Sequence, residues 1–151
     1  MGIMVNLPYG IEEIACSADE LLGYIQEYYE KGIYFGTNVV GTKYYPKGQK
    51  VLERLSSLVD RSGFKVVAER EKDNLYDSNA ISVNIQKKTN KVKIGYINRR
   101  LASVLSYLVE QGVKLEEQDY RIYGGSGRSA YGLTLYYRLI PGGEWDDDGN
   151  R

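Results

Sequence analysis

Apolar residues recur at helical spacing in three segments of the chain, which predicts three amphipathic helices. The first covers about 18–31 and begins with a capping box, in which Ser17 is the N-cap and Glu20 follows three residues later. The third runs from Arg99 to about Gln111 and has Asn98 as a candidate N-cap. The second closes near Gly63 and has its apolar face at Val51, Leu52, Leu55, Leu58 and Val59.

Alternating or β-branched runs predict strands in six other segments. These segments are about 33–45, 64–69, 80–86, 91–97, 118–123 and 131–140. The first of them is expected to end at Pro46. Short, closely spaced strands with two interspersed helices favour an antiparallel or mixed arrangement over a parallel βαβ sheet. The pattern therefore predicts a mainly β fold, a small six-stranded β-barrel with two interspersed helices and an extra N-terminal helix.

Charge is distributed unevenly, although the formal net charge of the 151-residue chain is zero. Residues 1–36 carry six acids and one base, residues 37–140 carry eighteen bases and ten acids, and residues 141–151 carry four acids and one base. We therefore divide the chain into an acidic helical extension at 1–32, a barrel domain at 33–140 and an acidic, disordered tail at 141–151. A basic domain is expected of a nucleic-acid binder, but a merely soluble surface accounts for the excess equally well.

Residue types that are missing exclude several kinds of catalytic and metal site. The sequence has no histidine and a single cysteine, Cys16, so a Ser-His-Asp triad and a histidine-ligated or cysteine-rich zinc site are excluded. The run Gly124-Gly125-Ser126-Gly127 is better explained as a hairpin turn than as a phosphate loop. No apolar run approaches the ~20 residues that span a bilayer, and the N-terminus lacks the features of a signal peptide. We expect a cytoplasmic protein with no cofactor, no metal and no catalytic activity.

Two segments combine aromatic and basic residues as nucleic-acid binding requires. In Thr42-Lys43-Tyr44-Tyr45, at the end of a predicted strand, adjacent tyrosines place one ring on each face and the lysine can neutralise a phosphate. Taken alone, this segment is explained more simply by one tyrosine in the core and the other on the surface. In Tyr120-Arg121-Ile122-Tyr123, the ring expected to be exposed is Tyr123, next to the glycine turn.

Two further segments carry polar groups that can bind a ligand or serve the fold. In the loop 73–79, Asn and Asp commonly bond their own backbone, which explains Asp77 and Asn79 well. A carboxylate in a basic domain can also accept a hydrogen bond from a hydroxyl or a base amine. Arg99 and Arg100 open the third helix, where arginines at a helix N-terminus make a phosphate site. The alternative for these arginines is a solvated helix face.

Four pieces of the segment 37–140 form an ordered series, namely Val39-Val40-Gly41-Thr42-Lys43-Tyr44-Tyr45, Asn74-x-Tyr76-Asp77-x-Asn79-Ala80-Ile81-x-Val83, Gly95-Tyr96-Ile97-Asn98-Arg99-x-Leu101-Ala102 and Tyr123-Gly124-Gly125. In these pieces, their order and their spacing, the segment resembles the HIRAN domain along its whole length. The resemblance implies a modified OB-like barrel. It also implies binding of single-stranded DNA, because in a helicase of the family the domain captures the 3′ end of a strand and assists fork reversal.

The resemblance implies a set of DNA-binding residues, which are Lys43, Tyr44, Tyr45, Asn74, Tyr76, Asp77, Tyr96, Arg99 and Tyr123. Among them, Lys43 and Arg99 would contact phosphates and Asp77 would accept the free 3′ hydroxyl. The other loop residues would help to hold the terminal nucleotide. The paired tyrosines would line the nucleotide pocket, and Tyr123 would stack on a base.

The chain also departs from the family pattern. Lys43 stands where the family often has arginine, which keeps the charge but loses bidentate geometry. Asp73 stands where the helicase form has asparagine, and the segment 46–63 is longer than the usual link. No helicase, RING or nuclease motif accompanies the domain.

The leading hypothesis is a non-catalytic module that binds single-stranded DNA, with selectivity for the 3′-hydroxyl end as its finer form. The alternative is a protein-interaction module recruited to a helicase or nuclease encoded elsewhere, without direct DNA binding. A metal-dependent phosphoester enzyme has the least support, because the carboxylates lack metal-ligand spacing. Steep salt dependence would distinguish DNA binding from an apolar protein interface.

Overall fold

The computed structural model describes residues 2–7, 10–15, 18–27, 33–127 and 129–142. Its strands are β1 (Gly2–Leu7), β2 (Gly10–Ala15), β3 (Ile33–Asn38), β4 (Lys65–Arg70), β5 (Ile81–Lys87), β6 (Asn90–Tyr96), β7 (Val113–Gly124) and β8 (Tyr131–Pro141). Its helices are α1 (Ala18–Glu27), α2 (Pro46–Ser56) and α3 (Arg99–Glu110), with a 3-10 helix η1 (Thr42–Tyr44) before α2. The fold is mainly β with a few helices, as the sequence predicts.

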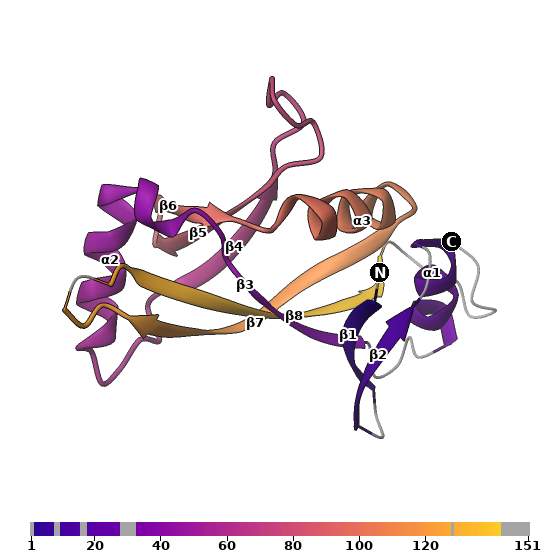
Figure 1. The fold of residues 1–151 in the computed structure, drawn as a ribbon, viewed down its shortest axis with the longest axis horizontal. Helices are drawn as coiled ribbons and strands as arrows, with labels where there is room; N and C mark the ends of the chain where they lie inside the picture. The colour runs from indigo at the N-terminus through magenta and orange to yellow at the C-terminus, as the bar shows by residue number, and fades with distance from the viewer. Residues whose placement is uncertain (1, 8–9, 16–17, 28–32, 128, 143–151) are drawn as a thin grey trace.

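The strands form two antiparallel sheets. The larger sheet has five strands in the order β2-β1-β3-β8-β7, and the smaller has three in the order β4-β5-β6. In Figure 1, β7 and β8 run side by side along the molecule, with α2 toward one end and α1 toward the other. The loop between β4 and β5 projects from the body (Figure 1).

The predicted six-stranded barrel is not confirmed, because the expected strands β3 to β8 are divided between the two sheets. At one edge the sheets are joined by an isolated bridge, in which Val40 and Tyr96 exchange backbone hydrogen bonds of 2.8 and 3.0 Å. At the other edge, the described residues of β4 and β7 form no ladder. There the amide of Ala68 donates to a carboxylate oxygen of Glu117 at 2.9 Å instead. A side chain thus occupies a place that a neighbouring strand would need for pairing.

One hydrophobic core joins the two sheets with α2 and α3. On β8, alternate residues Leu133, Leu135, Tyr137 and Leu139 are fully buried, as expected of a strand with one face on a core. The ring of Tyr137 stacks on Phe35 of β3, with centroids 5.3 Å apart and planes at 8°. α2 and α3 contribute the fully buried side chains of Leu52, Leu55, Ala102, Leu105 and Leu108, and α1 contributes Leu21 and Ile25.

The first predicted strand, 33–45, is too long. β3 ends at Asn38, and Gly41 then adopts a left-handed conformation (φ 75°) that leads the chain into η1. Pro46 is the first residue of α2, where its fixed φ suits the helix and its missing N–H is not needed. The helix ends before Val59, which was expected on its apolar face and is fully exposed.

The remaining central elements agree with the sequence pattern. α3 begins at the predicted residue, and Oδ1 of its N-cap Asn98 accepts the N–H of Leu101 at 2.9 Å. β7 begins at Val113 and is therefore longer than the predicted strand 118–123. Its register with β8 shifts between Glu117 and Asp119, and this irregularity interrupts the alternation on which the prediction depends.

The N-terminal part contains a β-hairpin that was not expected. β1 and β2 pair with each other, and Asn6 of β1 pairs with Tyr34 of β3, which attaches the hairpin to the larger sheet. α1 covers the first part of the predicted helix, whereas residues 28–31, the expected cap Ser17 and the tail from 143 lie outside the described residues. None of the helices in the described part of the chain combines the length and the hydropathy that crossing a bilayer requires.

Candidate functional site

The loop between β4 and β5 carries three of the predicted site residues and is folded by its own backbone. The N–H of Glu71 donates to the carbonyl of Ala80 at 2.8 Å, which closes the base of the loop. Within the loop, Oδ1 of Asn74 accepts the amides of Tyr76 and Asp77 at 2.9 and 3.0 Å. Asn74 therefore fixes the turn from the inside.

Asp77 uses one carboxylate oxygen for the loop and presents the other to a helix. Oδ1 accepts the N–H of Asn79 at 2.9 Å, which is the local turn that the sequence suggested. Oδ2 lies 3.7 Å from Nε of Arg99, the first residue of α3. The Asp77 side chain is 22% exposed and that of Arg99 is 82% exposed. A carboxylate, a guanidinium and a helix N-terminus therefore meet at one place.

A hydrogen-bonded network lies at the base of the loop. The carboxylate of Glu71, directly after β4, accepts from Nζ of Lys93 at 2.7 Å and from the hydroxyl of Tyr96 at 2.8 Å. Lys93 also donates to the Tyr96 hydroxyl at 2.8 Å. Nδ2 of Asn74 donates to Glu71 at 3.1 Å. The predicted site residue Asn74 is therefore held from both ends of its amide, and its orientation depends on Glu71.

This network keeps its acid and its base charged. Partial burial by itself raises the pKa of Glu71, but hydrogen bonds from Lys93, Tyr96 and Asn74 outweigh it and bring the pKa below that of an ordinary glutamate. Burial likewise lowers the pKa of Lys93, and the hydrogen bonds to Glu71 and Tyr96 more than reverse this effect. The pKa of Lys93 therefore lies above that of an ordinary lysine. For Tyr96, burial raises the pKa of the phenol.

The adjacent tyrosines lie on η1 and its C-terminal end, so their expected placement on opposite faces of a strand is wrong. The ring of Tyr45 lies against that of Tyr96, with centroids 6.2 Å apart and planes at 52°. Nζ of Lys93 lies 6.0 Å from the centroid of the Tyr45 ring. Tyr44 is 71% exposed, and Nζ of Lys43 lies 5.1 Å from its ring centroid. One tyrosine is thus built into the site and the other is on the surface beside it.

Gln49 of α2 connects η1 to the start of β8. Its Nε2 donates to the carbonyls of Thr42 at 3.1 Å and Tyr131 at 2.8 Å, and its Oε1 accepts the N–H of Tyr131 at 2.8 Å. The next residue, Gly132, pairs with Tyr123 of β7. Tyr123 is 42% exposed, which confirms that its ring is on the surface. It lies on the larger sheet beside the first residues of β8, the strand that contacts η1.

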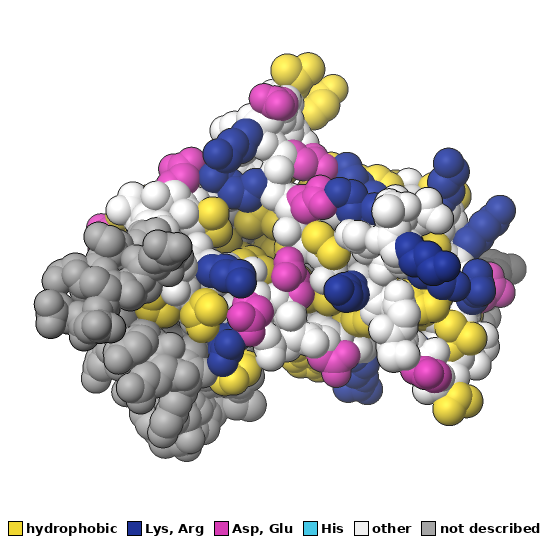
Figure 2. Space-filling view, turned by 180° about the vertical axis from the view of Figure 1, so that it is seen from behind, with side chains coloured by type: hydrophobic (Ala, Val, Ile, Leu, Met, Phe, Trp, Pro, Cys, Tyr) yellow, Lys and Arg dark blue, Asp and Glu magenta, His cyan; other side chains and the backbone are white. Residues whose placement is uncertain are grey.

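The end of the loop is apolar and exposed. Tyr76 is 93% exposed and its neighbour Leu75 is 96% exposed. Figure 2 shows apolar side chains at the tip of the projecting loop. The structure therefore leaves the Tyr76 ring apart from the other predicted residues. A continuous set of contacts brings together Tyr45, Asn74, Asp77, Tyr96 and Arg99.

Sequence reasoning missed Glu71 and Lys93. The register of β6 with β5 shifts so that Ile94 has no partner, which is a β-bulge. The extra residue places Lys93 and Tyr96 on the same side of β6, although a spacing of three puts two residues of a regular strand on opposite sides. The only available signal for Glu71 was its position between a predicted strand and the polar loop.

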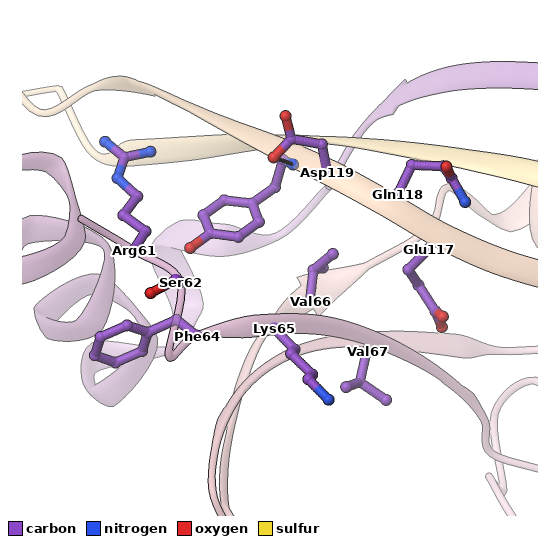
Figure 3. A pocket seen from close by; sticks show the side chains of 10 residues that line it. Arg61, Ser62, Phe64, Lys65, Val66, Val67, Glu117, Gln118 and Asp119 are labelled. Atoms are coloured by element: carbon purple, nitrogen blue, oxygen red, sulfur yellow. Dashed lines mark hydrogen bonds between the residues drawn. The ribbon is translucent and has the colours of Figure 1, made fainter. Parts of the chain in front are cut away.

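A separate hollow of about 490 Å³ lies between β4 and β7 and contains none of the predicted site residues. It is lined by residues 61–62, 64–67 and 117–120. Figure 3 shows residues of β4 on one side of this hollow and residues of β7 on the other. The predicted site and the hollow are therefore different places on the molecule.

Comparison with known proteins identifies the family. The family model of the HIRAN domain matches residues 33–136. The crystal structure of a protein from Lactobacillus plantarum aligns with a TM-score of 0.47 and 28% identity, over 70% of this chain and 91% of that one. The crystal structure of the HIRAN domain of human HLTF aligns with a TM-score of 0.43 and 22% identity, over 70% of this chain and 74% of that one. No match was found among curated proteins.

The match to the family model spans more than half of the chain and includes all of the predicted site residues. It agrees with the resemblance of residues 37–140, which rests on four sequence pieces in one order. The chain therefore belongs to the HIRAN domain family, a family of nucleic-acid-binding modules.

Proposed function

We propose that this chain is a non-catalytic module that binds single-stranded DNA and prefers an end with a free 3′ hydroxyl. The observation that carries the proposal is the meeting of Asp77 with Arg99 at the N-terminus of α3. A site for the end of a strand needs an acceptor for the terminal hydroxyl and a cation for the adjacent phosphate. This pair supplies both groups within one contact.

The terminal hydroxyl would be held by the free oxygen of Asp77. Oδ1 is used by the amide of Asn79, whereas Oδ2 accepts no hydrogen bond within the described part of the chain. A hydroxyl donating to a carboxylate makes a charge-assisted hydrogen bond. A 3′ phosphate would instead bring like charge against Asp77, so a hydroxyl end should bind more tightly than a phosphorylated one.

Phosphates would be held by Arg99, by the N-terminus of α3 and by Lys43. The first turn of a helix presents backbone N–H groups and partial positive charge to an anion. Arg99 is largely exposed, so its guanidinium is accessible to a phosphate while Nε remains near Asp77. Lys43 is exposed on η1 and adds a second positive charge, without the bidentate geometry of arginine.

The tyrosines would enclose the nucleotide. Tyr45 and Tyr96 form a fixed wall, and the exposed ring of Tyr44 offers a face for stacking. Tyr76 would close over the terminal nucleotide from the end of the loop, while Tyr123 would stack on a base farther along the strand. Asn74 would act indirectly, because its side chain is already engaged by the loop amides and by the network carboxylate.

Fluorescence anisotropy with short labelled strands tests this function. Strands that differ only in a 3′ hydroxyl or a 3′ phosphate are titrated with the full chain at low and moderate salt. We expect tighter binding of the hydroxyl end and a decrease of affinity with salt, since phosphate contacts release counterions. Binding that ignores the end would remove the end-capture part of the proposal, and no binding at low salt would overturn the whole.

A second candidate function is supported by the open edge between β4 and β7. Neither strand has a ladder partner on that side among the described residues, and the hollow of about 490 Å³ lies between them. Where Glu117 does not already take the backbone amide of β4, a partner segment could add as a strand to such an edge. The lining of the hollow carries both basic and acidic side chains, namely Arg61, Lys65, Glu117 and Asp119, which suits a protein partner better than a polyanion. On this reading the module is recruited to a helicase or nuclease in DNA repair, and its binding depends weakly on salt.

A further inference from the structure

The outer face of the larger sheet carries exposed tyrosines on three neighbouring strands. On β3, β8 and β7, alternate residues are buried or partly buried against the core, and the residues between them point away from it. The outward set includes Tyr34 on β3, 40% exposed, Tyr136 on β8, 37% exposed, and Tyr123 on β7, 42% exposed. Their pairing partners show that the three tyrosines cross the sheet diagonally.

Two of these rings lie over glycines of the adjacent strand. A Cβ atom added to Gly132 of β8 would lie 2.3 Å from Cζ of Tyr123. A Cβ atom added to Gly36 of β3 would lie 3.1 Å from Cε1 of Tyr136. Because glycine has no side chain, each ring can rest on the neighbouring backbone with its other side toward solvent. Two aromatic platforms, Tyr123 and Tyr136, are thus held in place on one face.

A free cation lies in the row between the two platforms. Arg121 of β7 pairs with Thr134 of β8, halfway between Gly132 and Tyr136. Arg121 is exposed and makes no hydrogen bond or ion pair within the part of the chain that the structure describes. In the same row, the hydroxyl of Thr134 donates to Oδ1 of Asn38 at 2.7 Å. Along β8, the outward positions therefore carry the Tyr123 ring over Gly132, then Thr134 beside Arg121, and then the Tyr136 ring.

Beyond Tyr136, the next cation on this face is paired with an acid. The guanidinium of Arg138 lies 5.8 Å from the ring centroid of Tyr34 and binds Glu116 at 2.7 Å. Asp119 lies opposite Tyr136. Because Arg138 is paired with Glu116, Arg121 is the cation of these rows that keeps its guanidinium for a ligand within the described part of the chain. A strand that runs along β8 from Gly132 to Tyr136 therefore passes Arg121, where a phosphate can meet an unpaired cation.

The end of this surface that carries Tyr123 and Gly132 lies next to η1. Val39 donates to the carbonyl of Leu133 at 2.8 Å, which places Val40 beside Gly132 in the register of β3 with β8. η1 follows directly after Gly41, so the Tyr123 platform lies next to the segment that carries the exposed Lys43 and Tyr44. From Gly132 to Tyr136, β8 covers ~13 Å, which is about four nucleotides of a stacked strand.

We infer that the outer face of β3, β8 and β7 is a second binding surface for single-stranded nucleic acid. A strand held by its end at the proposed site continues past η1, stacks one base on Tyr123 and another on Tyr136, and places one of the phosphates between them on Arg121. This inference rests on the proposed function, because the end site fixes where the strand starts. The surface reads no sequence, since every base has a face that stacks.

Strand length is the variable that tests this surface. The full chain is titrated with labelled oligothymidylates of about three and about ten nucleotides, both with free 3′ hydroxyls, since only the longer one can reach Tyr136. Wild type should bind the longer strand roughly fivefold to hundredfold more tightly, the effect of stacking one more base. Tyr136→Ala should remove this gain and leave the short strand unaffected, whereas Tyr136→Phe should keep it.

A charge variant gives an independent readout. Arg121→Ala should reduce the salt slope for the long strand by about 0.7 and leave that for the short strand unchanged, because one phosphate contact is lost. Lys65→Ala removes an exposed lysine at the start of β4 and is the charge-matched control. The inference is overturned if wild type shows no gain with length, or if the gain survives both Tyr136→Ala and Arg121→Ala. If wild type does not bind even the short strand, the proposed function itself is wrong.

Discussion

The hydroxyl of Tyr96, the last residue of β6, donates a hydrogen bond of 2.8 Å to Oε1 of Glu71, the residue that follows β4. Lys93 binds both partners, so the three groups form a closed triangle. The side chains of Lys93 and Glu71 are only 33% and 26% exposed. The loop that carries Asp77 is therefore held to β6 by a charged network that water reaches only in part.

Removal of the network carboxylate should destabilise the protein. Glu71→Ala leaves Lys93 and the Tyr96 hydroxyl without their acceptor in a partly buried place, and we expect the free energy of unfolding to fall by about 1–3 kcal/mol. Urea denaturation measures this loss. Glu69→Ala is the matched control, because Glu69 pairs with Lys91 at the surface and such pairs contribute about 0–1 kcal/mol. Equal losses in the two variants would show that the network has no special role.

Acid should weaken the same network. The pKa of Glu71 is lowered in the folded chain. The ionised carboxylate therefore stabilises the fold in full above the pKa of an unfolded glutamate, about 4.3. This stabilisation is lost as the pH falls through the lowered pKa of Glu71 in the folded state. The pKa of Lys93 is raised, so its contribution is kept below the ordinary lysine value and is lost only at higher pH. Thermal unfolding of wild type and Glu71→Gln should therefore converge as the pH falls from about 7 to about 3, and a constant difference would contradict this.

The hydrophobic pattern predicted the central strands and α3, because their alternation or helical spacing is regular. It failed where the backbone departs from regularity. The register shift at Ile94 places Lys93 and Tyr96 on one side, and no spacing rule shows this before the register of β6 is known. β3 ends at Asn38 and Gly41 turns the chain into η1, although both lie within a run of β-branched and aromatic residues that predicts a strand. The sequence therefore predicted site residues such as Asn74 and Tyr96. It did not predict the hydrogen bonds of Glu71 and Lys93 that hold them.

A closed barrel would require β4 and β7, which are far apart in sequence, to pair with each other. The strand pattern of β4 and β7 is compatible with a barrel, but whether two edges pair depends on their relative position in space. The carboxylate of Glu117 satisfies the amide of Ala68, and no local property of either residue indicates that contact. For the same reason, the diagonal of Tyr34, Tyr136 and Tyr123 becomes visible only once the registers of three strands are known.

The hydroxyl of Tyr137 offers a test of the core. Tyr137 is fully buried, its hydroxyl has no hydrogen-bond partner among the described residues, and burial raises its pKa. A buried polar group without a partner costs about 1–3 kcal/mol. Tyr137→Phe should therefore leave the free energy of unfolding unchanged or raise it, and keep the stacking on Phe35. A loss of more than about 1 kcal/mol in urea denaturation would indicate that the hydroxyl has a partner, such as a buried water.

The charge of Asp77 should determine which strand end is bound. Asp77→Asn keeps Oδ1 as the acceptor for the amide of Asn79 and replaces Oδ2 with a donor, so the loop is retained. We expect the preference for a 3′ hydroxyl over a 3′ phosphate to fall by about tenfold or more, the effect of a hydrogen bond to a charged group. Asp73→Asn removes a charge from an exposed position of the same loop and should change the affinity for both ends equally. A preference that survives Asp77→Asn would place the terminal hydroxyl elsewhere.

A substitution at Gly132 can displace the Tyr123 ring without altering the ring itself. In Gly132→Ala the new Cβ would lie 2.3 to 2.7 Å from three atoms of the Tyr123 side chain, so the ring must move off β8. We expect the affinity for single strands to fall by up to the ~1–3 kcal/mol that one stacked base contributes. Stability should not fall, because alanine loses less backbone entropy than glycine in a strand.

Gly63→Ala is the control for Gly132→Ala, since a Cβ at Gly63 would have no neighbour within 4 Å. It shares the entropy effect of the glycine-to-alanine change and leaves Tyr123 in place. Anisotropy titration and thermal unfolding of both variants separate the two contributions. If Gly132→Ala is as stable as the control and binds single strands as tightly as wild type, the seated ring takes no part in binding, because displacing it has then changed nothing.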